Sequence, residues 1–155
     1  MSNPLFQPLT IRHVTFRNRF MSTSHACGLE EGGLPKERYQ RYHEEKAKGG
    51  IGLTMFGGSS NVAPDSPSVF QQLYVGDDEV IPYLQQFSER VHRHGTAIMC
   101  QITHLGRRGE PYQGHWLPTI GPSAIRETLH RSFPKEMDHH DITRVVEAYG
   151  AAARR

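Results

Sequence analysis

The sequence predicts an α/β fold in which parallel strands alternate with helices. Three short apolar runs are each followed by a segment with apolar residues at helical spacing, in the order strand–helix–strand–helix–strand–helix. Strands separated in this way pair in parallel through right-handed crossovers. The third run, residues 97–101, ends in the amide of Gln101, which needs hydrogen-bond partners if it is buried. Ligands sit at the C-terminal ends of the strands in parallel barrels, so we expect a ligand site beside Gln101.

The first unit is preceded by a small hairpin at residues 10–16, with Arg12 and His13 between its two strands. Residues 19–23 predict a first buried strand, and a glycine-rich loop follows. Pro35 is expected in the first turn of the next helix, and Gly49-Gly50 are expected to end that helix.

The second unit begins with residues 51–56, which predict a strand ended by Gly57-Gly58. Residues 59–75 are rich in Ser, Pro and Gln and predict a long loop. Asp77 or Asp78 can cap the next helix, whose apolar positions recur at helical spacing: Val80, Leu84, Phe87 and Val91.

The third unit continues from the strand at 97–101 into a Gly- and Pro-containing stretch, residues 105–137, which predicts a long loop of functional importance. Asp138 can cap a last helix, with Asp141 favourable in its first turn. The expected apolar face of this helix consists of Ile142, Val145, Val146 and Tyr149. Because the helix runs to the last residue, we expect one truncated domain over residues 1–155, with the C-terminal half of a barrel absent.

The composition argues against several classes of protein. A net charge of +2 with scattered Lys and Arg does not favour nucleic-acid binding. No apolar run has the length of a membrane span, and the N-terminus lacks the features of a signal peptide. Cys27 and Cys100 give neither a disulfide framework nor a metal-binding pattern, which is consistent with a reduced, cytoplasmic protein.

The 10 histidines raise the alternative of a metal-dependent barrel hydrolase. His139-His140-Asp141 is the most suggestive group, but adjacent histidines at a helix start point apart and no third ligand has matching spacing. We therefore expect no metal site.

The motifs together resemble the N-terminal half of the Old Yellow Enzyme-like NADH:flavin oxidoreductase family. They follow in order along essentially the whole chain: Pro4-Leu5-Phe6-Gln7-Pro8-Leu9, Arg17-Asn18-Arg19-Phe20, Gly57-Gly58, the Gln-x-x-His-x-Gly-Arg from Gln101, Gly121-Pro122-Ser123-Ala124, and Pro134-Lys135-Glu136-Met137. His25 and the segment 28–33 are similar to the branch of 2,4-dienoyl-CoA reductase, trimethylamine dehydrogenase and the N-methylproline and betaine demethylases.

The resemblance implies a (β/α)8 TIM barrel that binds FMN, of which this chain holds about three to four βα units. It implies that an amide at Gln101 contacts the pyrimidine side of the flavin, and that Gly58 lets the ring approach the second strand. It also implies flavin contacts from the segment after the first strand: Thr23, Ser24, His25 and Ala26. Each position also has an ordinary structural explanation, in which Gln101 pairs with backbone and Gly58 is a plain loop glycine.

The resemblance further places Cys27, His104 and Arg107 at the substrate pocket. His104 is a candidate general base, although a histidine fixed by hydrogen bonds in a loop is more common. Arg107 is a candidate partner for a substrate carboxylate, although most such arginines form structural ion pairs. Cys27 is equally explained as a small buried thiol, because a covalent flavin bond would need a cysteine one position earlier, where Ala26 stands.

The implied activity is FMN-dependent oxidation or reduction of a small molecule by hydride transfer at flavin N5. One version is oxidative demethylation of an N-methyl amino acid or betaine, and another is NAD(P)H-dependent reduction of an activated alkene or dienoyl-CoA. Full-length relatives often add a 4Fe-4S cluster and a site for FAD or NAD(P)H, none of which has a counterpart here. A third possibility is a non-catalytic fragment that needs the missing barrel half from a second polypeptide, or assembles as a homo-oligomer.

Overall fold

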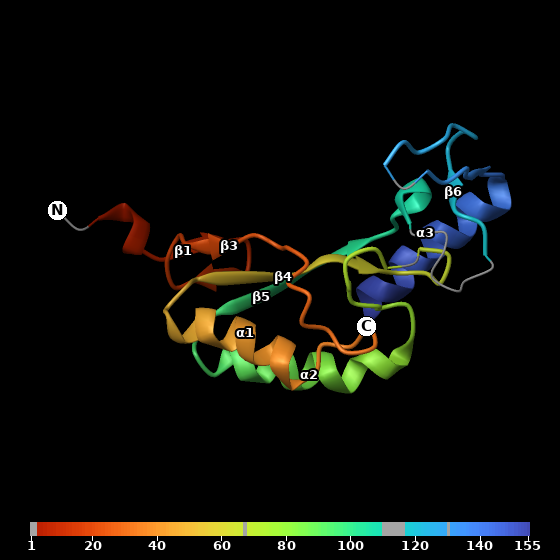
Figure 1. Cartoon of the computed structure of the whole chain (residues 1–155). Coiled ribbons are helices and arrows are strands. Elements are labelled where there is room, and N and C mark those ends of the chain that lie inside the picture. Colours follow the sequence, from red (N-terminus) through yellow and green to blue (C-terminus); the bar gives the residue numbers. More distant parts are fainter. Residues whose placement is uncertain (1–2, 67, 110–116, 130) are drawn as a thin grey trace.

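A parallel sheet forms the centre of the chain, whose computed structural model describes residues 3–66, 68–109, 117–129 and 131–155. The sheet contains three strands in the order β3 (Met21–Ser22), β4 (Leu53–Asn61) and β5 (Ala97–Thr103). Two helices connect these strands and cover the same face of the sheet (Figure 1), namely α1 (Glu37–Lys48) and α2 (Ile81–His92). The predicted alternation of parallel strands and helices is therefore confirmed.

An antiparallel hairpin precedes the sheet, as the sequence predicts. A short 3-10 turn, η1 (Pro4–Phe6), leads into β1 (Leu9–Ile11), which pairs with β2 (Val14–Phe16). Arg12 occupies the tight turn with a φ of 53°, a left-handed conformation that such two-residue hairpin turns require.

Strand β3 is shorter and more exposed than the sequence suggests. Only Met21 and Ser22 of the expected strand at 19–23 pair with β4, and the side of Met21 that faces away from the helices is open, leaving that residue 49% exposed. The expectation of a first buried strand was therefore wrong for this chain. An apolar composition predicts a strand, but burial requires a second layer, and among the described residues none covers this part of the sheet.

The main core lies between the sheet and the two helices. Phe87 and Val91 of α2 are fully buried against Tyr39 and Ala47 of α1 and Phe56 of β4. The expected helical face of α2 is confirmed, with Asp77 capping the short turn η2 (Asp78–Val80) that begins it. Helix α1 starts at Glu37, two residues after Pro35, so the expected place of Pro35 in the first turn was wrong, whereas Gly49 ends the helix as expected.

A bulge in β4 corrects the expected end of the second strand. The strand does not stop at Gly57-Gly58 but continues to Asn61, and its register with β5 shifts between Phe56 and Ser60. Gly57, Gly58 and Ser59 have φ values of 104°, 52° and 84°, which bend the strand. A Cβ atom on Gly58 would collide with the peptide between His25 and Ala26, so the glycine permits close backbone contact there.

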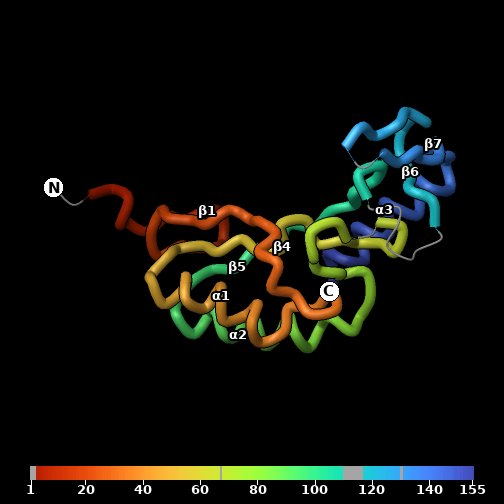
Figure 2. The backbone as a smooth tube through the Cα atoms, viewed as in Figure 1, coloured from red at the N-terminus to blue at the C-terminus, as the bar shows by residue number. Residues whose placement is uncertain are grey.

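A second, smaller core joins the far ends of the strands to α3 (His139–Arg154). It contains Val62, Val75 and Val80 together with Ala152 of the helix. Figure 2 shows the C-terminal end of the chain beside the segment that leads into α2, where Arg155 Nε lies 2.7 Å from an oxygen of Asp78.

Helix α3 begins with the expected cap but buries a different face. Asp138 and Asp141 form a capping box, in which each side chain accepts a hydrogen bond from the other residue's backbone. Tyr149 packs against the second core, whereas Ile142 and Val146 are exposed. The expected apolar face that included those two residues was therefore only partly right.

The long segment before α3 contains regular structure that the sequence did not predict. A 3-10 turn, η3 (Gly106–Arg108), is followed by two short strands that pair in parallel, β6 (Ile120–Gly121) and β7 (Lys135–Glu136). Two-residue strands have too short a pattern to be distinguished from loop.

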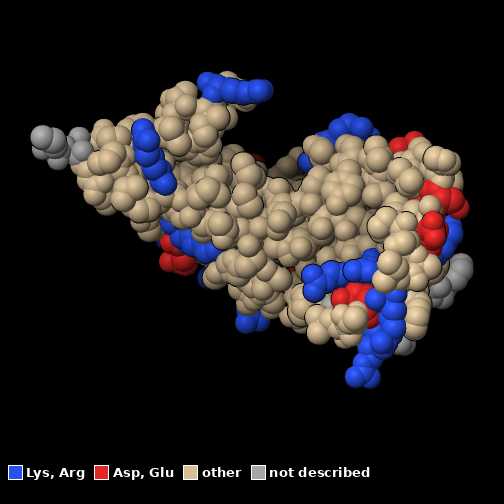
Figure 3. Space-filling view, turned by 90° about the horizontal axis from the view of Figure 1, so that it is seen from above, with Lys and Arg blue, Asp and Glu red and all other residues tan. Residues whose placement is uncertain are grey.

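The face of the sheet opposite α1 and α2 is an open apolar surface. Figure 3 views the molecule from that side and shows few charged side chains over its middle. A hollow of about 300 Å³ lies there, lined by the hairpin and by one side of each strand, including Met21, Met55 and Met99. Within the described part of the chain, no helix has the length and apolarity needed to cross a membrane.

The buried His43 of α1 makes stability depend on pH. Burial lowers the pKa of this imidazole to about 3, with further lowering from the charges of Lys46 and His25. Below the ordinary histidine pKa of 6.5 the unfolded chain takes up a proton that the folded chain does not, so stability falls as the pH drops from about 6.5 towards 3. We expect this residue to contribute up to about 1.4 kcal/mol per pH unit. Urea unfolding at several pH values between about 4 and 7 measures the slope.

The control for this effect is the exposed His13 in the hairpin turn. His43→Gln should flatten the pH dependence of the unfolding free energy, whereas His13→Gln should leave it unchanged. Equal slopes in all three proteins would contradict the assignment to His43.

The close approach at Gly58 predicts a large and specific cost for an added methyl group. Gly58→Ala should destabilise the fold by more than the roughly 1–2 kcal/mol that a left-handed conformation costs a non-glycine residue, because its Cβ also meets the His25–Ala26 peptide. Gly32→Ala is a matched control, since Gly32 has a φ of 66° but nothing within 4 Å of its Cβ position. Thermal unfolding of both variants compares the two costs, and similar losses would show that the contact is unimportant.

Candidate functional site

The exposed amide of Gln101 lies near the C-terminal end of β5, beside the segment that follows β3. The hydroxyl of Ser24 donates a 2.6 Å hydrogen bond to Gln101 Oε1. This bond determines the orientation of the amide and leaves its NH2 group without an acceptor among the described residues. The strand end therefore presents two N–H donors to solvent, held in place by a neighbouring loop.

The backbone of His25 and Ala26 presents further donors at the same place. Both residues are exposed, and neither backbone N–H has an acceptor within the described ranges. Gly58 holds this peptide against β4, so the structure gives Gly58 a role in chain packing. Thr23, Ser24, His25, Ala26, Gly58 and Gln101 are thus brought together by three strands at one edge of the sheet, as the sequence analysis expects.

A side-chain contact with α1 holds the His25 imidazole, which the sequence analysis did not foresee. Tyr42 Oη lies 2.8 Å from His25 Nε2, and the two rings meet edge to face with centroids 5.7 Å apart. The ammonium of Lys46 lies 4.3 Å from the centroid of the Tyr42 ring. Tyr42 and Tyr39 share a helix face in the sequence, but nothing in the pattern indicates that one of them reaches the loop after β3.

Cys27 belongs to the core below the strand ends. Its side chain packs against the cluster around Tyr39 and Phe56, and burial raises the pKa of the thiol. Both properties fit the small buried thiol considered above and give no support to a place in the substrate pocket.

His104 is fixed by hydrogen bonds on both ring nitrogens. Nδ1 accepts from the backbone N–H of Gly106 at 3.1 Å, and Nε2 lies 3.2 Å from a carboxylate oxygen of Asp65. The side chain is only 5% exposed, and the hydroxyl of Tyr149 accepts a hydrogen bond from the His104 backbone. This geometry favours the structural explanation for His104 over a general base, which needs a free nitrogen that faces substrate.

Asp65 is the centre of this group. Its carboxylate also forms a bidentate ion pair with Arg144 of α3, at 2.9 and 2.6 Å. Burial raises the pKa of Asp65, but the hydrogen bonds from His104 and Arg144 outweigh it, so the pKa lies well below its usual range. The sequence analysis missed Asp65 and Arg144, which are 79 residues apart and carry no local motif.

Arg107 faces away from the amide of Gln101. Its guanidinium donates to the carbonyl of Ile125 at 3.4 Å and forms no ion pair with a described residue. His104 and Arg107 line a separate cavity of about 340 Å³ between η3, β6 and α3, and Gln101 is not among the residues that line it. The placement of His104 and Arg107 at the substrate pocket stays a prediction.

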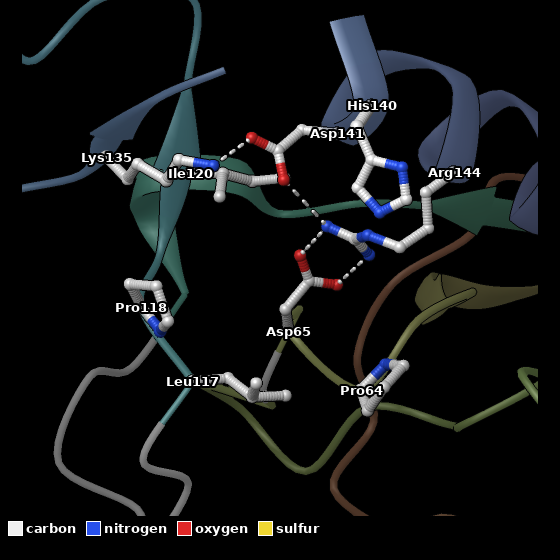
Figure 4. Close-up of a pocket in the computed structure, with 9 residues that line it drawn as sticks. All are labelled: Pro64, Asp65, Leu117, Pro118, Ile120, Lys135, His140, Asp141 and Arg144. Carbon is white, nitrogen blue, oxygen red and sulfur yellow. Dashed lines mark hydrogen bonds and ion pairs between the residues drawn. The ribbon is translucent and has the colours of Figure 1, made fainter. Parts of the chain in front are cut away.

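A neighbouring pocket is lined by charged side chains from the N-terminal part of α3, from β7 and from the segment after β4. It has a volume of about 350 Å³, and Figure 4 shows that its charged side chains are directed towards one another. Lys135 pairs with Asp141 at 2.7 Å, and Arg144 joins Asp141 to Asp65. These charges neutralise each other, so the charged side chains that line the pocket serve one another as ion-pair partners. Within the described residues, no group of three or more His, Cys, Asp or Glu side chains could hold a metal.

The chain is similar in sequence to enzymes that act on alkenes and N-methyl groups. It is 58% identical over 154 residues to a multifunctional alkene reductase/demethylase OYE of Caballeronia cordobensis, covering 99% of this chain and 23% of that protein. It is 44% identical to a probable N-methylproline demethylase of Rhizobium meliloti strain 1021, again over 99% of this chain and 23% of that protein. The chain thus spans less than a quarter of the length of these relatives.

The fold also matches that of a solved structure. The structure superposes on a 2-naphthoyl-CoA reductase with a TM-score of 0.90 at 22% identity, covering 97% of this chain and 25% of that one. This likeness confirms the expected partial α/β barrel. The model of the NADH:flavin oxidoreductase / NADH oxidase family matches residues 4–155, and the chain therefore belongs to that family.

Proposed function

We propose that the strand ends around Gln101 form part of an FMN site in a hydride-transferring oxidoreductase. The observation that carries this proposal is the oriented amide of Gln101, whose oxygen accepts from Ser24 and whose NH2 group has no acceptor among the described residues. The carbonyl oxygens of a flavin pyrimidine ring are the acceptors that such a group requires. The family match supports the choice of flavin over other ligands.

The donor set fits the group chemically. Backbone N–H groups of His25 and Ala26 can stabilise negative charge at one edge of the ring, and the Gln101 amide can hold the pyrimidine edge. Tyr42 restrains His25 and so keeps this segment in place. When bound, the flavin supplies two-electron hydride chemistry, while these residues supply position and electrostatics.

The proposed reaction is oxidative removal of the methyl group from an N-methyl amino acid, in which the flavin would accept the hydride and the neutral amine nitrogen would supply the lone pair that forms the iminium. The name of the Rhizobium relative supports this choice, and the name of the Caballeronia relative includes the same activity. Oxidation of the methyl carbon gives an iminium that water converts to formaldehyde and the demethylated amine. The second candidate is reduction of an activated alkene, which the Caballeronia relative's name also supports.

The remainder of the flavin site is proposed to come from other barrel strands. In barrels of this type the phosphate site is formed by the loops after strands 7 and 8, and none of the three parallel strands described here supplies it. The open apolar face with Met21, Met55 and Met99 would then be covered by those strands, either from the same polypeptide or from a partner. The two thiols, Cys27 and Cys100, are unpaired and suit a reducing, cytoplasmic setting.

Loss of the Gln101 amide should weaken flavin binding. Gln101→Leu removes the donor from the strand end, and the lost hydrogen bond predicts about a tenfold higher dissociation constant for FMN. Gln86→Leu, at an exposed position of α2, is the control and should bind FMN as the wild type does. Fluorescence titration of the apoprotein with FMN measures both, and equal affinities would show that Gln101 does not contact the flavin.

The choice between the two reactions can be tested with the FMN-loaded protein. We expect N-methylproline to bleach the flavin absorbance anaerobically and to release one formaldehyde per flavin reduced. Buffer alone and proline, which has no N-methyl group, serve as blanks. Flavin that stays oxidised with N-methylproline, but is reduced by NADPH and reoxidised by an activated alkene, would reject demethylation in favour of the second candidate.

A further inference from the structure

A polar cavity beyond the C-terminal end of β4 is unused by the proposed flavin site. Its volume is about 330 Å³, at the lower end of the range of about 300–1,000 Å³ for small-molecule pockets. It is lined by the glycine-rich loop, by the last residue of β4 and by the segment after it, including Glu30, Gly33, Asn61, Gln72 and Tyr74.

Backbone contacts build this cavity from three separate parts of the chain. The N–H of Tyr74 donates to the carbonyl of Gly33 at 2.8 Å, and Asn61 exchanges hydrogen bonds with Leu73 and Val75 at 2.7 and 2.8 Å. A Cβ on Gly33 would lie 3.1 Å from the Cβ of Tyr74, so the loop and the segment are in close contact. The walls are therefore held by main-chain pairing.

The amide of Gln72 is buried, oriented and only half used. Its Oε1 accepts hydrogen bonds from the hydroxyl of Ser68 at 2.8 Å and from the backbone N–H groups of Val69 and Phe70 at 2.7 and 3.0 Å. Because backbone N–H groups can only donate, this atom must be the oxygen. The residue is 4% exposed, and its NH2 group has no acceptor among the described residues.

Asn61 provides a second amide whose oxygen is hydrogen-bonded while its NH2 group has no acceptor among the described residues. Its Oδ1 accepts from the hydroxyl of Ser66 at 3.0 Å, and that hydroxyl in turn accepts from the N–H of Leu105 at 2.7 Å. Asn61 is 3% exposed, and its NH2 group has no acceptor in the described part of the chain. Two amides that line one cavity thus have NH2 groups with no protein acceptor among the described residues, and neither nitrogen is sealed from solvent, because no buried side-chain nitrogen or oxygen there lacks a partner.

The glycine-rich loop adds an acceptor with a negative charge, the carboxylate of Glu30. One carboxylate oxygen of Glu30 accepts from the N–H of Gly33, and the other has no partner among the described residues. Tyr74, which is half-buried, is another of the residues that line this cavity. A carboxylate beside an aromatic ring favours a substituted ammonium, through charge and through cation–π attraction.

We propose that this cavity binds a compact zwitterion, with the carboxylate at Gln72 and Asn61 and the substituted ammonium at Glu30 and Tyr74. The two NH2 groups are available to an acceptor, and a carboxylate supplies two oxygens for them. The choice of an N-methylated amino acid as the zwitterion rests on the proposed function. The cavity lies near the flavin-facing strand ends, since Asn61 pairs with Thr103, two residues beyond Gln101 in β5.

The test is calorimetric titration of the flavin-free protein with N-methylproline, which can bind there without being oxidised, in the wild type and in Gln72→Glu. Glutamate keeps an oxygen for the Ser68, Val69 and Phe70 donors but replaces the NH2 group with a negatively charged acceptor. We expect Gln72→Glu to raise the dissociation constant for N-methylproline by at least about tenfold. N-methylpyrrolidine, which lacks the carboxylate, should bind this variant no more weakly than the wild type.

Gln71→Glu is the matched control, because Gln71 is the exposed neighbour and receives the same change in charge. It should change the affinity for N-methylproline by less than about twofold. Glu30→Gln is the second variant. It keeps an acceptor for the N–H of Gly33 but removes the negative charge, so it should lower the affinity for both N-methylproline and N-methylpyrrolidine. If the melting temperature of Gln72→Glu lies well below that of the wild type, the affinities measured for Glu30→Gln test the proposal instead.

Several outcomes would overturn the proposal. These are no heat of binding for N-methylproline in the wild type, equal losses in Gln72→Glu and Gln71→Glu, or unchanged affinity in Glu30→Gln. The binding of FMN by each protein is measured separately. Binding of N-methylproline but not of FMN would support the cavity and count against the proposed flavin site, whereas binding of FMN but not of N-methylproline would do the reverse.

Discussion

The contact between β4 and the peptide joining His25 to Ala26 is the constraint on which the strand-end geometry depends. Gly58 has no room for a Cβ, and a Cβ on the adjacent Gly57 would lie 2.7 Å from the carbonyl oxygen of Gln101. The same two glycines therefore bring the segment after β3 and the end of β5 against one strand. The bulge that accompanies them shifts the register by which Ser60 and Asn61 pair with β5. The strand ends proposed to contact flavin and the cavity lined by Asn61 both adjoin this irregularity.

A buried ion-pair group holds the far end of the sheet to α3. Asp65 connects the segment after β4 to His104 after β5 and to Arg144 of the helix. A carboxylate with its pKa lowered by these partners is stabilised in the charged form, so removal of one partner would leave an uncompensated buried charge. The group therefore restrains the loops that line the cavities on either side. Its role explains why His104, which stands in a family motif, is not exposed to a ligand.

The sequence was sufficient for the order of elements and for the residues at the strand ends, but not for how those residues are held. Hydrophobic spacing identified α2 through Phe87 and Val91, and the capping box of α3 was readable from Asp138 and Asp141. The continuation of β4 past Gly58 could not be read, because consecutive glycines predict a strand end unless the contact with His25 is known. Long-range partners such as Asp65 and Arg144 leave no local pattern. For the same reason, the sequence does not indicate the partners of His104 and Arg107, which are Asp65 and the carbonyl of Ile125.

Two glutamines in different surroundings are oriented by the same physical means. Gln101 has its oxygen occupied by the Ser24 hydroxyl, and Gln72 has its oxygen occupied by the loop that surrounds it. An amide whose oxygen is saturated in this way can only donate, so its selectivity for an acceptor is set before any ligand arrives. Pre-oriented donors cost little reorganisation on binding. At Gln101 the amide is exposed and suits the edge of a planar ring, whereas at Gln72 it is buried and suits a small anion that can enter the cavity. The difference in burial, not in residue type, is what separates the cofactor contact proposed for Gln101 from the substrate contact proposed for Gln72.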